Sequence, residues 1–176
     1  MNLPENFELL DSAKYFESYF KEDWDVIKGY LTSHMNYHNY FRNELTKRVA
    51  DFLGYHYQKD DGVIINKFAS QKSLMNAQFV STMIMSDGEV KMLDELFGKG
   101  KRTNRLGEGR ATAYFFKING KLVMLFHDSR GVATEMEPNL TKEEFLDIEI
   151  DLIKYLYSGF SQEWKDEINE IMGRVK

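Results

Sequence analysis

Three dipeptides of Asp or Asn followed by Gly constrain the fold of this chain more than any other feature. They are Asp61-Gly62, Asp87-Gly88 and Asn119-Gly120. A two-residue hairpin turn requires positive φ angles, which Gly, Asn and Asp adopt at little cost. Each dipeptide lies between short runs of apolar, β-branched or aromatic residues. The sequence therefore predicts three successive β-hairpins, and hence an antiparallel sheet.

The hairpins are expected over residues 55–65, 79–93 and 113–126, and the last of them contains the most apolar strand. Positions 122–126 read Leu-Val-Met-Leu-Phe, so both faces of this strand should be covered. We therefore expect it at the centre of the sheet. A last strand over 132–136 should end at Pro138, because proline cannot donate a hydrogen bond to a strand ladder.

The segment before the sheet has helical periodicity. Apolar residues recur there at steps of four, three and four, at Leu9, Ala13, Phe16 and Phe20. Further helices are expected from Asp23 onward and over 36–53, where Gly54 can supply a left-handed C-terminal residue. These helices should occupy residues 1–54.

The segment after the sheet is also helical in pattern. Thr141 and Glu144 have the spacing of a capping box. An apolar stripe follows at Phe145, Ile148, Leu152 and Tyr155. Gly159 should end this helix, and Ser161 should begin a final one.

These patterns predict one α+β domain over residues 1–176. Its parts are an N-terminal helical segment (1–54), an antiparallel β-meander of about five to seven strands (55–137) and C-terminal helices (138–176). The chain of 176 residues contains no cysteine, which excludes disulfides and thiol chemistry. No apolar run approaches the roughly 20 residues that span a bilayer, and the N-terminus lacks a targeting pattern. We expect a cytoplasmic protein with no membrane contact and no cofactor.

Residues 98–110 form the most unusual segment, with four glycines, five basic residues and one acid. This composition cannot bury much apolar surface, so we expect a mobile loop. Its basic residues are Lys99, Lys101, Arg102, Arg105 and Arg110. They could bind nucleic acid, a phosphorylated ligand or an acidic protein, or simply keep a connection between strands soluble. The spacing does not match a phosphate-binding Walker loop.

The charges of the chain are unevenly distributed. Residues 98–131 carry eight basic and two acidic side chains, whereas residues 135–176 carry five basic and eleven acidic ones. Tyrosines cluster on the expected helix over 36–53, including Tyr37 and Tyr40. Because Tyr and Met are enriched at protein interfaces, this helix is a second candidate contact surface.

Glu89-Val90-Lys91 resembles the acid-x-lysine element of metal-dependent nucleases of the PD-(D/E)XK type, if it lies on a strand. Asp61 and Glu44 would supply further carboxylates. A turn at Asp87-Gly88, however, places no acid across the hairpin from the Glu-Lys pair. His34 and His38 lie one helical turn apart without an evident third ligand, so we predict no metal site.

The sequence favours a non-catalytic protein that binds a macromolecule, in the class of a regulator, an inhibitor or an assembly factor. The basic segment and the Tyr-rich helix would supply the contacts, and a protein partner, acidic in character, is the expected one. The alternative is a nucleic-acid-binding protein or a nuclease that uses Glu44, Asp61, Glu89 and Lys91.

Overall fold

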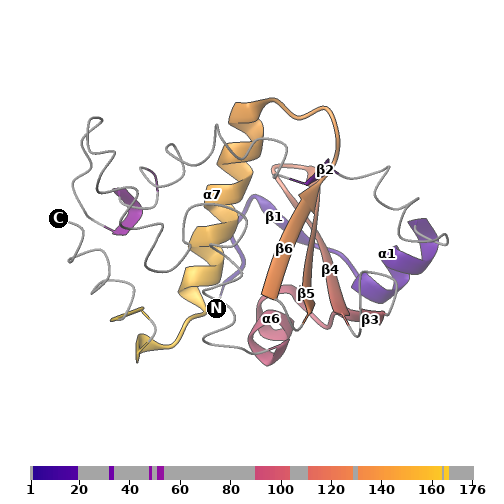
Figure 1. Cartoon of the computed structure of the whole chain (residues 1–176), viewed down its shortest axis with the longest axis horizontal. Coiled ribbons are helices and arrows are strands. Elements are labelled where there is room, and N and C mark those ends of the chain that lie inside the picture. The colour runs from indigo at the N-terminus through magenta and orange to yellow at the C-terminus, as the bar shows by residue number, and fades with distance from the viewer. Residues whose placement is uncertain are drawn as a thin grey trace.

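The computed structural model describes residues 2–19, 32–33, 48, 51–53, 90–103, 111–128, 131–163 and 165–166. These residues form an α+β structure with an antiparallel sheet (Figure 1), as the sequence predicts. In chain order the elements are β1 (Phe7–Leu9), α1 (Ser12–Tyr19), β2 (Thr32–Ser33), α6 (Val90–Phe97), β3 (Lys101–Thr103), β4 (Ala111–Ile118), β5 (Lys121–Asp128), β6 (Gly131–Met136) and α7 (Lys142–Ser158). Six strands join in one sheet, in the order β1-β4-β5-β6-β2, with β3 paired to β4 off this path.

The hairpin formed by β4 and β5 is the centre of the sheet. Its turn residues Asn119 and Gly120 have φ angles of 55° and 75°, as a two-residue hairpin turn requires. The residue before this turn, Ile118, pairs with the residue after it, Lys121. β5 then pairs with β6 on its other side, which confirms the expected central position of the apolar strand.

The other edge of β4 is shared by two short strands. β3 pairs with β4 over Ala111, Thr112 and Ala113, and β1 pairs with it over Phe116, Lys117 and Ile118. Both pairings are antiparallel, so β1 and β3 run in the same direction along one edge. The chain thus leaves this edge after Leu9 and returns to it at Lys101.

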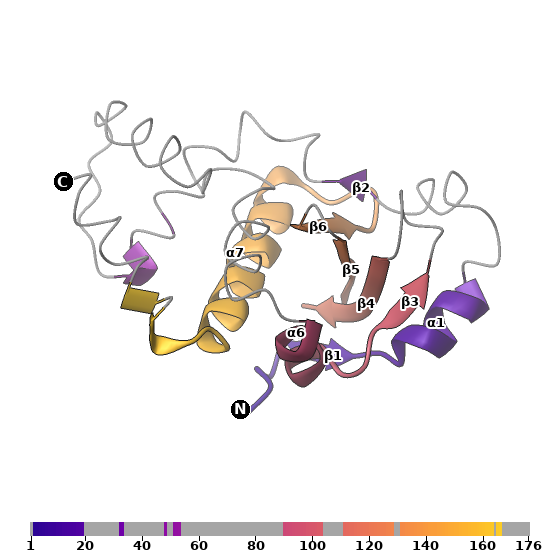
Figure 2. The ribbon, with the colours of Figure 1, turned by 60° about the horizontal axis from the view of Figure 1, so that its bottom comes forward.

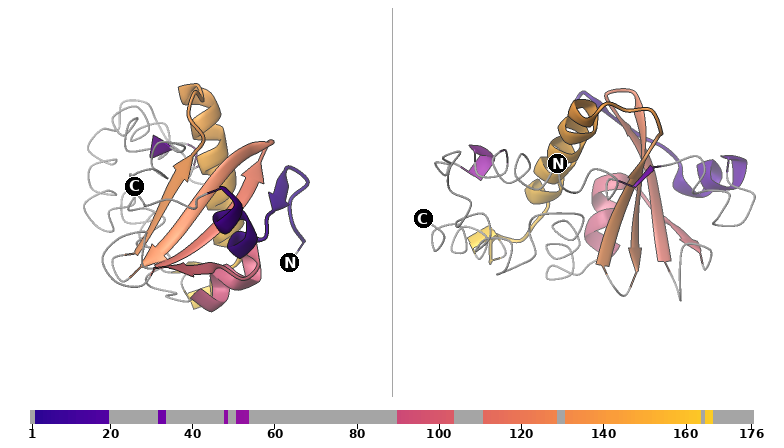
Figure 3. Two further views of the ribbon diagram at one scale, coloured as in Figure 1. Left: turned by 90° about the vertical axis from the view of Figure 1, so that its right-hand side faces the viewer. Right: turned by 45° about the horizontal axis from the view of Figure 1, so that its top comes forward.

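Helices cover both faces of the sheet, with α1 on one side and α7 on the other (Figures 1 and 3). On the α1 side, Phe16 packs with Ala111, Ala113, Phe115 and Met124. On the opposite side, Phe97 of α6 stacks on Phe116 at 4.5 Å between ring centroids and contacts Tyr114 and Tyr155. Alternate residues of β4 therefore belong to two different core layers.

The capping box, the apolar stripe and the terminal glycine that the sequence predicts for α7 are confirmed. The Thr141 hydroxyl accepts a hydrogen bond from the Glu144 amide, and the Glu144 carboxylate accepts one from the Thr141 amide. The predicted stripe at Phe145, Ile148, Leu152 and Tyr155 is buried, and Gly159 is the C-terminal cap. Among the described helices, none is both long and apolar enough to cross a membrane.

Two predicted elements are wrong. Residues 90–93 of the strand expected over 89–93 instead begin helix α6, whose residues Met92, Leu93, Leu96 and Phe97 are buried at helical spacing. The N-terminal segment is not wholly helical, because β1 and β2 join the sheet. Leu9 is the first residue of the predicted helical stripe, but pairing with β4 places it in a strand with Phe7.

Other expected elements lie outside the described residues. They are the helix begun at Asp23, most of the helix over 36–53, the hairpin over 55–65, the strand over 79–85 and most of the final helix begun at Ser161.

Substituting Phe115→Ala should lower the free energy of unfolding by about 3–5 kcal/mol, because Phe115 is fully buried and its removal leaves a cavity between α1 and the hairpin. Urea denaturation measures this change. The exposed Leu3→Ala control should change it by less than about 0.5 kcal/mol. Equal losses in both variants would contradict the assignment of the core.

Candidate functional site: a pocket at the sheet edge

An open pocket of about 730 Å³ lies where the chain leaves and rejoins the edge of β4. Two chain segments line it, and we call it the edge pocket. The lining residues are Leu9, Leu10, Asp11 and Ala13 on one wall, and Phe97, Gly98, Lys99, Gly100, Lys101 and Arg102 on the other. The first wall links β1 to α1 and the second links α6 to β3, and Figure 2 shows these four elements side by side.

Between β1 and β3, the backbone of β4 bonds to the first wall instead of to a strand. The Leu10 amide donates to the Phe115 carbonyl oxygen at 3.1 Å. The Phe115 amide donates to the Ser12 hydroxyl oxygen at 3.0 Å, and the Ser12 side chain is buried. We call this stretch of the β4 edge, between β1 and β3, the join. Its polar backbone groups are satisfied within the chain, as buried backbone groups must be.

The second wall is held by Asp94 of α6. Its Oδ1 atom accepts hydrogen bonds from the Tyr114 hydroxyl at 2.7 Å and from the Gly100 amide at 3.3 Å. Burial first, and the bond to Asp94 second, raise the pKa of Tyr114 well above its ordinary value. The hydroxyl therefore stays protonated and remains a donor at physiological pH.

Gly100 passes closer to β4 than any residue with a side chain could. A Cβ atom at this position would lie 2.4 Å from Thr112 Cγ2 and 2.8 Å from the Tyr114 ring. Gly98, just after α6, has a φ of 75°, where glycine is least strained. The two glycines thus lead the chain from the end of α6 into β3.

The predicted mobile loop over 98–110 is therefore partly wrong. Its residues 101–103 form β3 and pair with β4, so backbone pairing compensates for the low apolar content of this stretch. Residues 104–110, with Arg105 and Arg110, lie outside the described part of the chain. The same holds for Tyr37 and Tyr40.

Three of the predicted binding residues, Lys99, Lys101 and Arg102, come together on one wall of the edge pocket. The Lys101 ammonium pairs with the Glu17 carboxylate of α1 at 2.8 Å. Lys99 and Arg102 are exposed, and the described residues include no ion-pair partner for either. The opposite wall contributes one carboxylate, Asp11, whose Oδ1 accepts from the Lys14 amide at the start of α1. The pocket therefore has an excess of positive charge.

Sequence reasoning missed the residues that build the pocket. Asp94 looks like an ordinary acid on an amphipathic helix, and Tyr114 looks like a core aromatic. Leu9 was assigned to a helical stripe, whereas its side chain is 38% exposed and lines the pocket. No local signal in the sequence marks Asp94 and Tyr114 as partners or places Leu9 in a pocket.

The proposed nuclease residues do not assemble among the described residues. Lys91 lies exposed on helix α6, so the strand geometry that the nuclease element requires is lost. Glu44, Asp61 and Glu89 lie outside the described residues. In the part of the chain that the structure describes, no group of three or more His, Cys, Asp or Glu residues is arranged to hold a metal ion.

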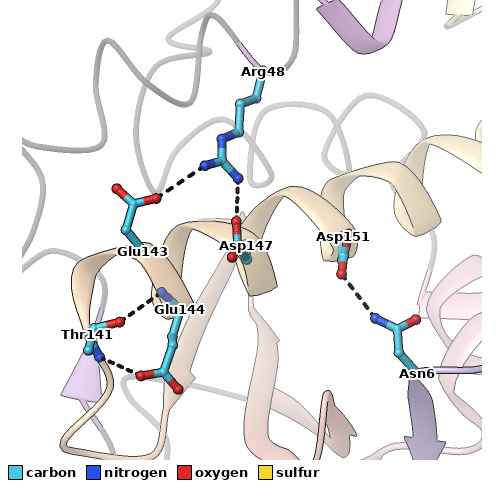
Figure 4. Close-up of polar contacts among 7 residues, drawn as sticks. All are labelled: Asn6, Arg48, Thr141, Glu143, Glu144, Asp147 and Asp151. Atoms are coloured by element: carbon cyan, nitrogen blue, oxygen red, sulfur yellow. Dashed lines mark hydrogen bonds and ion pairs between the residues drawn. The ribbon is translucent and has the colours of Figure 1, made fainter.

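Several acidic residues of the C-terminal helix α7 bind other segments of their own chain (Figure 4). Arg48 forms ion pairs with Glu143 at 3.3 Å and with Asp147. The Asn6 amide group donates to Asp151 at 3.0 Å. These carboxylates hold other segments against α7, which gives them a structural role.

Comparisons with protein-family models, curated proteins and solved structures find no match to this chain. The function is therefore inferred from the chemistry of the edge pocket.

Substituting Tyr114→Phe should lower the free energy of unfolding by about 1–3 kcal/mol, because the Asp94 carboxylate loses a buried donor. It should also speed hydrogen exchange of the Gly100 and β3 amides. Tyr155→Phe is the matched control, since the buried Tyr155 hydroxyl donates to the Leu96 carbonyl oxygen at 2.7 Å. Native-state hydrogen exchange should show faster exchange at Gly100 only in the first variant; the same change in both would contradict the role of Asp94.

Proposed function

We propose that this protein is a non-catalytic binding protein that docks an acidic segment of a partner protein in the edge pocket. The observation that carries the proposal is the convergence of Lys99, Lys101 and Arg102 on one wall of an open pocket of about 730 Å³. A regulator, an inhibitor or an assembly factor would act in this way.

The size of the pocket suits a short segment of a partner. Ligand pockets typically measure about 300–1,000 Å³, and a stable protein interface buries about 1,600 Å² in all. The edge pocket would thus be one anchoring point within a larger contact. Exposed cations at such a point accelerate the encounter with an acidic partner and select against a basic one.

The burial of the aromatic rings around the edge pocket favours a protein partner over single-stranded nucleic acid. Proteins that bind single strands stack bases on exposed aromatic rings. The aromatic residue that lines the edge pocket, Phe97, is 1% exposed, and the neighbouring Tyr114, Phe115 and Phe116 are fully buried.

The double variant Lys99→Ala/Arg102→Ala should bind a fluorescent oligo-glutamate peptide about tenfold more weakly than the unchanged protein, because two exposed charge contacts of up to about 1 kcal/mol each are lost. Fluorescence anisotropy measures the affinity. The control Lys91→Ala/Lys142→Ala removes the same charge from exposed positions outside the pocket and should bind nearly as well as the unchanged protein.

Equal weakening in both double variants would contradict a specific pocket. Tighter binding of a single-stranded DNA oligonucleotide than of oligo-glutamate, with a steep dependence on salt, would instead favour a nucleic-acid partner.

Substituting Glu17→Gln should strengthen oligo-glutamate binding by about twofold to fivefold, because Lys101 no longer has an intramolecular carboxylate partner. The Glu17 side chain is 68% exposed, so the free energy of unfolding should change by less than about 1 kcal/mol. Glu8→Gln is the control, since Glu8 is exposed on β1 and does not line the pocket. Unchanged or weaker binding by the Glu17 variant would show that Lys101 does not contact the peptide.

A further inference from the structure

The two walls of the edge pocket differ in chemistry. The second wall, residues 97–102, carries the cations Lys99, Lys101 and Arg102. The first wall, residues 9–13, carries Asp11 and the apolar side chains of Leu9, Leu10 and Ala13. A ligand that satisfies only the cations leaves the apolar wall exposed to water. This asymmetry restricts the chemistry of the segment that fits.

Leu9 is the main apolar contact available on that wall. It pairs with Phe116 in the sheet and lies on the same strand face as Phe7, yet Phe7 is 6% exposed and Leu9 is 38% exposed. Among the described residues, the large apolar side chains with this degree of exposure are Leu3, Leu9 and Phe52. Of these three, Leu9 lines the pocket.

We propose that the edge pocket recognises a protein segment in which an apolar side chain accompanies carboxylates, with the apolar group on Leu9 and the carboxylates at Lys99 and Arg102. This inference rests on the proposed function and adds the chemistry of the partner. Burial of the apolar group supplies affinity that does not depend on salt, and the cations fix the orientation of the segment.

The backbone at the join favours recognition through side chains. The Phe115 amide and carbonyl oxygen already bond to Ser12 and Leu10, so they cannot bond to an added strand at this point. A partner segment therefore lies between the walls and contacts Leu9 on one side and the cations on the other.

The inference is tested with two fluorescent peptides of equal length and charge, one alternating Glu with Leu and the other alternating Glu with Ser. In anisotropy titrations the unchanged protein should bind the Leu peptide about tenfold more tightly, since burying a leucine side chain contributes enough for that difference. This comparison uses unchanged protein, so it does not depend on whether a variant folds.

The variant Leu9→Ser should lose most of this preference. Leu3→Ser is the matched control, because Leu3 is also 38% exposed and does not line the pocket, and it should keep the preference. Circular dichroism spectra of both variants establish that each is folded.

Each other result overturns the inference. Equal binding of the two peptides to the unchanged protein, or loss of the preference in both variants, excludes Leu9 as the apolar contact while leaving oligo-glutamate binding and the proposed function intact. Failure of the protein to bind either peptide or oligo-glutamate overturns the proposed function as well. Tighter binding of a single-stranded DNA oligonucleotide than of the Leu peptide, with displacement of bound Leu peptide by the DNA, would assign the pocket to nucleic acid.

Discussion

The burial of the β4–β5 hairpin on both faces is the constraint on which the rest of the structure depends. Phe115 and Met124 pair across the hairpin on one face, and Phe116 and Val123 pair on the other, and all four are fully buried. A sheet centre that is apolar on both sides must be covered on both sides. Helix α1 covers one face, and α6 and α7 cover the other.

The length of β4 creates the candidate site. Among the described strands, no single edge strand spans β4. β1 and β3 share its edge, and the chain leaves and re-enters the sheet between them. Ser12 and Leu10 satisfy the backbone of β4 at the join. Asp94 and Gly100 set the path of the returning segment. The edge pocket lies between these two stretches of chain, so the core and the pocket share the residues that build them.

The chemistry of this pocket supports the binding function that we propose. Its polar lining consists mainly of two amines and a guanidinium, and such cationic groups attract anions. Helix α6 places Lys91 outside the pocket, so the pocket cannot use the residue on which the nuclease hypothesis depended. The apolar wall around Leu9 gives the pocket a second kind of contact, which distinguishes a protein segment from a simple polyanion.

The sequence by itself determined the elements whose causes are local. The Asn119-Gly120 turn, the fully apolar central strand and the Thr141–Glu144 capping box all depend on residues within a few positions of each other, and all three are confirmed. The basic character of residues 99–102 was also evident. Only the tertiary structure decided that Phe7 and Leu9 form a strand, because three residues become a strand only when β4 pairs with them. It also decided the pocket itself, since Asp94 meets Tyr114 across 20 positions and Lys101 meets Glu17 across 84. Contacts at such separations depend on the packing of the whole sheet, which no local pattern specifies.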